Sequence, residues 1–331
     1  VTASWELDVF GRMRNAKKQA KALYAQSEDY RQAVRTQLIT GIANTYYTLL
    51  MLDEQLDLSR QTETAWKETV ASTRALMNAG LANESAVSQM EAAYYQVQSS
   101  VLDLQQQISQ VENSLALLLA ETPRSYERGM LAKQQFPTDL SIGIPVRMLS
   151  SRPDVRSAER TLEAAFYGTN AARSAFYPSI TLSGSAGWTN SAGSLILNPG
   201  KFLASAVGSL TQPLFNKGQV VAQYRIARAQ QEEAALGFQQ TLLNAGSEVN
   251  DALIAYQTSQ GKRILLDKQI TSLQTALRST TLLMEHGNTT YLEVLTSRQS
   301  LLTAQLSQTA NHFTEIQSLI NLYRALGGGQ E

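Results

Sequence analysis

Few side chains in this sequence could carry out catalytic or metal chemistry, and their spacing does not assemble them into a site. The 331 residues include no Cys, which excludes disulfides and thiolate metal ligands. The two histidines, His286 and His312, are too far apart for a helical metal pair, which needs His four residues apart. No phosphate loop, dinucleotide fingerprint or nucleophile elbow is present. We therefore predict that the protein is not an enzyme, with no cofactor and no metal.

Charge does not indicate a nucleic-acid partner either. The chain has 28 basic and 28 acidic residues, so it lacks the basic footprint of a nucleic-acid binder. One basic cluster, Arg12, Arg14, Lys17, Lys18 and Lys21, lies near the start of the chain. A solvated helix face and a role near lipid headgroups or in a channel both stay open for this cluster.

Proline placement indicates where the helices are. All seven prolines lie between Pro123 and Pro213, which leaves long proline-free flanks on both sides. An interior proline costs a helix about 3 kcal/mol, so flanks rich in Ala, Gln, Leu and Glu are predicted to be helical. No apolar run approaches the ~18 residues of a membrane-spanning helix. If the protein lies in a membrane, strands must cross it.

The two flanks are copies of one another. "STRALMNAG" at 72–80 matches "STTLLMEHG" at 279–287, which indicates an internal duplication. In both copies apolar residues recur in alternating steps of three and four, the pattern of a coiled-coil seam, and Gly80 and Gly287 interrupt it. Each copy is therefore predicted to be a long helix, a tight turn and a shorter returning helix.

Three segments alternate apolar and polar residues as amphipathic strands do: 1–9, 179–189 and 202–212. Each alone is typical of an ordinary soluble sheet. Together, beside long helical rods and without another core, they favour strands that cross a bilayer. The residues assigned to the lipid-facing side are Trp5, Leu7, Ile180, Leu182, Trp188 and Phe202.

Three strands cannot close a barrel, and an open edge in lipid leaves backbone groups unsatisfied. The second copy has a strand pair before its long helix, whereas the first has one strand, so we expect its partner upstream of Val1. Four strands per chain are still fewer than the ~8 of the smallest outer-membrane barrels. Several chains must therefore pool their strands.

At this point the sequence resembles the outer-membrane channel family of tripartite efflux pumps, which includes TolC and, closer to this chain, the OprM-like, NodT-type lipoprotein branch. The resemblance covers nearly the whole chain. Its motifs are "SWELDVFGR" at 4–12, "SSRPDVRSAERTLEAA" at 150–165, "AARSAFYPSITLSGSAG" at 171–187, "QPLFNKG" at 212–218, "GNTTYLEVL" at 287–295 and "LYRALGGG" at 322–329. It implies a mainly α fold with membrane β-strands, in which a homotrimer builds a helical tunnel through the periplasm and a twelve-stranded barrel. It also implies a first strand, and in the lipoprotein branch an acylated Cys, upstream of this chain.

By the same resemblance, the expected function is a passive exit duct in the outer membrane. The duct would carry drugs and other toxic small molecules from an inner-membrane transporter of the RND type and a periplasmic adaptor protein to the exterior. A type I protein-secretion channel uses the same architecture and stays open as an alternative. A soluble coiled-coil scaffold is an alternative of a different class.

The resemblance also implies a gate near the second hairpin tip. Leu292 matches the family's apolar ring and Glu293 its first acidic position. Thr296 stands where many members carry an aspartate, and Thr289 where some carry a gating arginine, which puts a salt-bridge latch in doubt. Three Glu293 carboxylates around a three-fold axis would attract cations. Without the family match, Glu293 is typical of a solvated surface carboxylate.

Adaptor docking is expected at the two hairpin tips, where small and polar residues allow close approach. The residues are Asn78, Ala79, Gly80 and Leu81 at the first tip, and His286, Gly287 and Asn288 at the second. Bare turns are the alternative. The expected division of the chain is a barrel strand (1–11), a helical hairpin (12–121), a linker (122–150), a helix (151–177), a β-hairpin (178–215), a second helical hairpin (216–327) and a tail (328–331).

Overall fold

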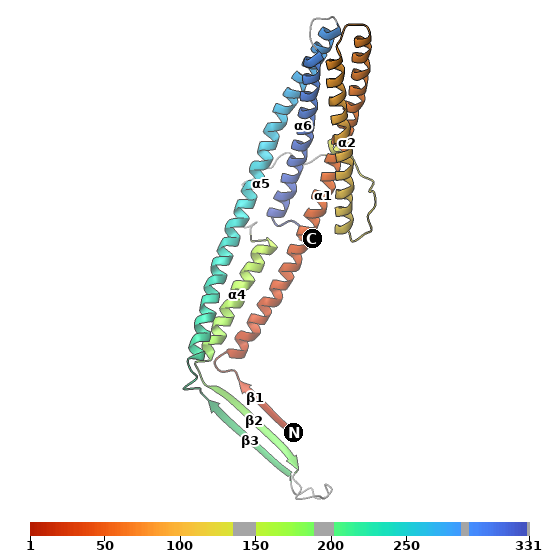
Figure 1. Cartoon of the computed structure of the whole chain (residues 1–331). Coiled ribbons are helices and arrows are strands. Elements are labelled where there is room, and N and C mark those ends of the chain that lie inside the picture. Colours follow the sequence, from red (N-terminus) through yellow and green to blue (C-terminus); the bar gives the residue numbers. More distant parts are fainter. Residues whose placement is uncertain (135–149, 189–201, 286–290, 330–331) are drawn as a thin grey trace. The chain divides into compact units, whose positions relative to one another are not determined.

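The computed structural model describes residues 1–134, 150–188, 202–285 and 291–329, and most of them are helical (Figure 1). The chain divides into two compact units. Unit 1 comprises residues 1–33 and 149–245, and unit 2 comprises residues 34–148 and 246–331. The two longest helices, α1 (Arg12–Asn78) and α5 (Gln219–Glu285), contribute to both units.

The predicted duplication is visible in the helix bounds. Helix α2 (Glu84–Leu118) returns after α1, and α6 (Tyr291–Ala325) returns after α5. Each bound of α5 and α6 lies 207 residues after the matching bound of α1 and α2. The repeated sequence pattern therefore builds the same hairpin twice, a 67-residue helix followed by a 35-residue one.

Unit 1 contains an antiparallel sheet with strand order β1 (Thr2–Leu7), β2 (Ser179–Trp188) and β3 (Phe202–Thr211). Side chains on one of its faces are joined by hydroxyl contacts, Thr181 to Ser209 at 2.5 Å and Ser185 to Ser205 at 2.8 Å. Because opposite residues of an antiparallel pair share a face, these contacts mark the polar side of the sheet.

In the helical part of unit 1, α4 (Pro153–Ser174) lies between the first part of α1 and the first part of α5 (Figure 1). Pro153 stands in the first turn of α4, where its missing N–H and fixed φ suit a helix start. The carboxylate of Asp29 on α1 pairs with Arg156 at 2.8 Å, and the Thr169 hydroxyl donates to the Ala227 carbonyl on α5 at 3.0 Å. These contacts hold the three helices side by side.

Unit 2 has its core along the coiled-coil seam. Trp66 from α1, Met90 and Val97 from α2, and Leu302 from α6 form one buried cluster. A second cluster includes Leu49, Leu52, Ile108 and Leu115. The seam predicted for α2 is buried at six positions, Val87, Met90, Val97, Val101, Ile108 and Leu115. The steps of three and four in the sequence therefore identify the packed face of α2.

The segment after α2 is held against this core. It contains a 3₁₀ turn, Leu131–Lys133, and Leu131 is buried against Leu50 and Ile316. The Arg128 guanidinium forms a two-point pair with Asp53 on α1, at 2.5 and 2.9 Å, and contacts Glu112 on α2 at 2.6 Å. Residues 135–149 of the expected linker lie outside the described part of the chain.

None of the helices that the structure describes is both long enough and apolar enough to cross a membrane.

Candidate functional site

The first hairpin tip is a tight, capped turn. The N–H of Gly80 donates to the Met77 carbonyl and that of Leu81 to the Leu76 carbonyl, both at 2.9 Å. Gly80 has φ +77°, a left-handed conformation that favours glycine, and a Cβ there would meet open space. The Asn83 side chain accepts from the Ala86 N–H at 2.8 Å and caps α2. The predicted turn is confirmed.

The four residues predicted to dock an adaptor at this tip lie on the surface. Asn78, Ala79, Gly80 and Leu81 are all exposed, and Leu81 is exposed to 77%. A single exposed leucine is ordinary on a protein surface, so the exposure of Leu81 does not by itself indicate a partner. Docking itself stays a prediction.

Helix α6 begins at Tyr291, and its first two turns carry three of the four predicted gate residues. Leu292 is 52% exposed, and Glu293 and Thr296 are also exposed. Positions 292, 293 and 296 follow helical spacing and share one face. The opposite face is buried, with Val294 at 2% exposure. The gate residues therefore face away from the core of unit 2.

Glu293 stands in the first turn of α6, where the helix dipole favours a negative charge. Within the described residues it forms no ion pair, so its charge is available to an ion or a partner. The Thr296 hydroxyl donates to the Leu292 carbonyl at 2.8 Å, as threonines in helix interiors often do. Thr289, His286, Gly287 and Asn288 lie outside the described residues.

The six apolar strand residues fall in register on one face of the sheet. Trp5 stands opposite Leu182 and Leu7 opposite Ile180. Trp188 stands opposite Phe202. Trp5, Leu182 and Phe202 are about half exposed or more. The shared face follows from the period of two along each strand. That this face contacts lipid stays a prediction.

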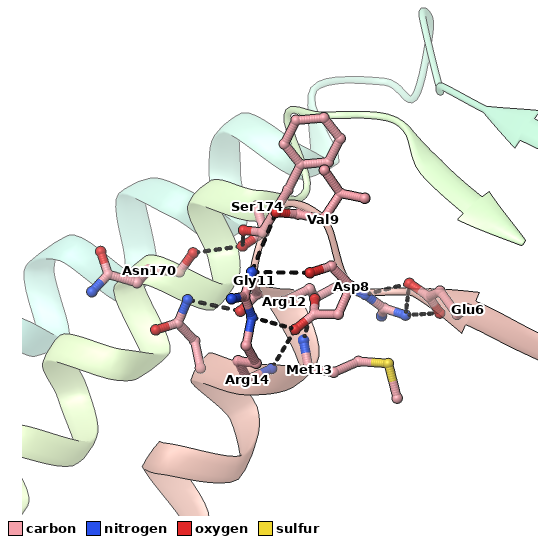
Figure 2. A network of polar contacts seen from close by, with 11 residues as sticks. Glu6, Asp8, Val9, Gly11, Arg12, Met13, Arg14, Asn170 and Ser174 are labelled. Carbon is pink, nitrogen blue, oxygen red and sulfur yellow. Dashed lines mark hydrogen bonds and ion pairs between the residues drawn. The ribbon is translucent and has the colours of Figure 1, made fainter.

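Where β1 leads into α1, the structure reveals a charge network that the sequence interpretation missed (Figure 2). Arg12 forms a two-point pair with Glu6, at 2.8 and 2.6 Å. Asp8 accepts from the backbone N–H groups of Met13 at 3.0 Å and Arg14 at 2.7 Å, and so caps α1. Opposite charges on either side of Gly11 were the available signal. Two members of the basic cluster are thus paired, and not free for lipid headgroups.

The same contacts change the acidity of Asp8. Burial tends to raise the pKa of its carboxyl group, but the N–H groups of Arg14 and Met13 and the Arg14 guanidinium outweigh burial and hold the pKa below its usual range.

The bend between β1 and α1 is made at Gly11, which has a φ of +79°. Beside it, the Ser174 hydroxyl on α4 donates to the Phe10 carbonyl at 3.2 Å. This junction therefore fixes the direction in which the strand leaves the helix.

Among the described residues, no three His, Cys, Asp or Glu side chains are grouped so that they could hold a metal ion.

A comparison with protein-family models identifies the chain's family. The model described as outer membrane efflux protein matches residues 1–121 and 144–328. These two ranges include both helical hairpins and all three strands.

Similar proteins of known role agree with this match. The solvent efflux pump outer membrane protein SrpC of Pseudomonas putida is 31% identical over 335 residues, which cover 99% of this chain and 70% of SrpC. The cation efflux system protein CusC of Escherichia coli (strain K12) is 28% identical over 330 residues, covering 99% of this chain and 72% of CusC. The solved structure of the outer-membrane channel OprN superposes with a TM-score of 0.94 at 27% identity, covering 99% of this chain and 74% of OprN.

Proposed function

The chain belongs to the outer membrane efflux protein family, and on this premise we propose that its periplasmic entrance is the end of unit 2 where α6 begins. As a member of this family it is an outer-membrane efflux channel, not an enzyme, and it acts as a trimer with an adaptor and an inner-membrane pump. Our proposal concerns the finer points, namely which residues form the gate, which dock the adaptor, and what passes.

One observation carries the gate proposal. Leu292, Glu293 and Thr296 share an exposed face at the start of α6, while the residues between them pack into the core. In a trimer, three copies of this face can meet around the symmetry axis. Leu292 would supply an apolar ring and Glu293 a ring of three carboxylates. Thr289 is the fourth residue that we include in the gate, and the missing aspartate at Thr296 argues against a salt-bridge latch.

The carboxylate ring would favour cations. A cation roughly 7 Å from each of three carboxylates gains about 0.3 kcal/mol from each after screening at about 0.1 M salt, or about 1 kcal/mol in total. That energy corresponds to about a fivefold preference for cations over the same channel without the ring. The preference should shrink at about 1 M salt, where the Debye length falls to about 3 Å.

The hairpin tips are the proposed adaptor site. Exposed Leu81 and the small residues Ala79 and Gly80 allow a helical hairpin to approach the first tip closely. His286, Gly287 and Asn288 would serve the same purpose at the second tip. We expect Leu81→Glu to abolish cross-linking to the adaptor in cells while single-channel conductance is unchanged. Undiminished cross-linking would remove the first tip from the docking surface.

The cargo we propose is small toxic compounds supplied by an RND-type pump. The name of SrpC refers to solvent efflux and that of CusC to cation efflux, so relatives of similar identity serve different cargoes. Where three chains pool their strands, the side chains that we expect to face lipid are Trp5, Leu7, Ile180, Leu182, Trp188 and Phe202. Survival of a deletion strain with solvents, drugs or metal salts distinguishes the cargo classes.

The gate is tested by reconstituting the trimer of the full-length protein in planar bilayers and measuring reversal potentials. Glu293→Gln should lower the cation preference about fivefold at about 0.1 M KCl. Glu84→Gln is the matched control, because Glu84 is an exposed carboxylate in the first turn of α2. Equal effects of the two substitutions, or no effect of Glu293→Gln at low salt, would contradict the gate proposal.

A further inference from the structure

A small pocket in unit 2 lies between helical stripes of α1 and α6. Its volume is about 220 Å³. One wall is Leu58, Gln61, Thr62 and Ala65 of α1, the other is Arg298, Leu301, Leu302 and Gln305 of α6, and Leu277 of α5 completes the lining. Both stripes have i, i+3, i+4, i+7 spacing, so each presents one face of its helix. Five of the nine lining residues are apolar, three are neutral and polar, and one is charged.

That charged group, Arg298, is incompletely satisfied. Its Nε and Nη1 atoms are shielded from solvent, and no acceptor in the described part of the chain lies within hydrogen-bond reach of them. Buried guanidinium N–H groups that lack an acceptor cost free energy. A bound carboxylate in the plane of the guanidinium would accept hydrogen bonds from them and remove that cost. An anion-binding site requires N–H donors of this kind, which are shielded from solvent and have no acceptor in the protein.

The surroundings of Arg298 compensate its charge only in part. Its guanidinium stacks over the Trp66 ring, 5.5 Å from the ring centroid, which provides a cation–π attraction. Burial lowers the pKa of Arg298 below its usual range, and the attraction of exposed Glu68 only partly opposes this shift. Trp66 itself is 1% exposed, and its indole N–H also finds no acceptor among the described residues.

We propose that this pocket binds small amphipathic carboxylates, with the carboxylate on Arg298 and an aliphatic or monocyclic body against the leucines. The volume is below the about 300–1,000 Å³ of pockets for drug-sized ligands, which limits the occupant to a small molecule. The leucines and Ala65 favour an apolar body over a fully hydrated inorganic anion. The neutral polar side chains that can contact the edge of the ligand are Gln61, Thr62 and Gln305.

Trp66 makes the proposal measurable. The chain has three tryptophans, Trp5, Trp66 and Trp188, so Trp5→Phe and Trp188→Phe leave the indole beside Arg298 as the only one in this chain. The purified trimer is titrated with cyclohexanecarboxylate while its tryptophan emission is recorded. Cyclohexylmethanol, which has the same ring and no charge, is the ligand control. We expect a saturable change with a Kd of about 1 mM for the acid.

Two substitutions test the two parts of the site. Arg298→Gln removes the charge and should weaken acid binding at least about tenfold, whereas the same change at exposed Arg278 on α5 should leave it unaltered. Ala65→Phe keeps the arginine but fills the pocket, and should abolish binding. Native mass and circular dichroism establish that each variant is a folded trimer.

Three results would overturn the proposal. Equal responses to the acid and the alcohol would mean simple apolar partitioning. Acid binding that survives both Arg298→Gln and Ala65→Phe would place the ligand elsewhere. No response of the folded trimer at any concentration would mean that a neighbouring copy of the chain covers the pocket. Because the titration measures binding and no transport, its failure would leave the gate proposal standing, and failure of the gate would leave this site standing.

Discussion

Replacing Arg128 should release the segment that follows α2. The Arg128 side chain forms ion pairs with both α1 and α2, through Asp53 and Glu112. Arg128→Met keeps much of the length and apolar stem of the side chain and removes the charge and all the donors. Two carboxylates would then remain beside one another without their shared partner, which adds repulsion to the lost bonds.

The magnitude follows from the burial of the partners. Glu112 is 14% exposed, so its charge-assisted bond to Arg128 is assigned about 2 kcal/mol. Asp53 is 35% exposed, and solvent screening reduces its two-point pair to about 1 kcal/mol. The total of about 3 kcal/mol corresponds to a rise of more than about 100-fold in the local opening equilibrium of residues 122–134.

Hydrogen exchange with mass spectrometry, on the trimer in detergent, measures this equilibrium directly. Peptides from residues 122–134 should exchange much faster in Arg128→Met, while peptides from the interior of α5 should not change. Arg124→Met is the matched control, because the Arg124 side chain is 60% exposed and its contacts, an ion pair with Glu121 and a cation–π contact with the Tyr126 ring, lie outside α1 and α2. If both variants behave alike, or if Arg128→Met exchanges like the wild type, the bridge does not hold the segment.

Three further predictions concern the same contacts and turns. Burial alone would raise the pKa of the Glu112 carboxyl group, but its hydrogen bonds to Arg128 and Ser125 outweigh burial and hold the pKa below 4.5. The stabilising contribution of Glu112 is therefore complete above pH 4.5 and is lost as the pH falls through the lowered pKa. Hydrogen exchange of residues 122–134, corrected for intrinsic rates, should therefore rise on acidification. Gly80→Ala should destabilise the first tip by about 1 kcal/mol, because residue 80 has a φ of +77°. Gly41→Ala should instead stabilise α1 by up to about 1 kcal/mol, because Gly41 lies inside that helix with open space around it. Thermal unfolding measures both effects. Asp8→Ala should speed amide exchange in the first turn of α1, and unchanged rates would mean that Asp8 is not its cap.

Much of the fold could be predicted because its signals are periodic. The 207-residue offset between the two copies predicted two like hairpins, and α1 with α2 and α5 with α6 repeat at that offset. Gly80 interrupts the seam where the chain turns with positive φ. Strand alternation predicted which side chains share a face, since the side-chain period in a strand is two. Membership of the efflux family excludes the soluble scaffold that the heptads alone allowed.

Contacts between residues distant in sequence could not be predicted. Arg128 is 75 residues from Asp53, and no local pattern connects them. The pair of Arg298 with Trp66 depends on how α6 packs on α1, which the seam indicates only as a face. By contrast, Glu6 and Asp8 lie close to Arg12 and Arg14 in sequence, and their opposite charges were a usable signal for the junction.

Disulfide cross-linking tests most directly the central claim that the start of α6 surrounds the three-fold axis of the trimer. The printed chain contains no Cys, so a bond formed by a single introduced cysteine within it must join two subunits. Leu292→Cys should give oxidant-dependent cross-linked dimers, because equivalent residues near the axis can reach the Cα separation of about 4.4–6.8 Å that a disulfide needs. Leu81→Cys, exposed at the other tip, is the control and should not cross-link. Cross-links from Leu81→Cys alone would contradict the account and move the constriction away from Leu292 and Glu293.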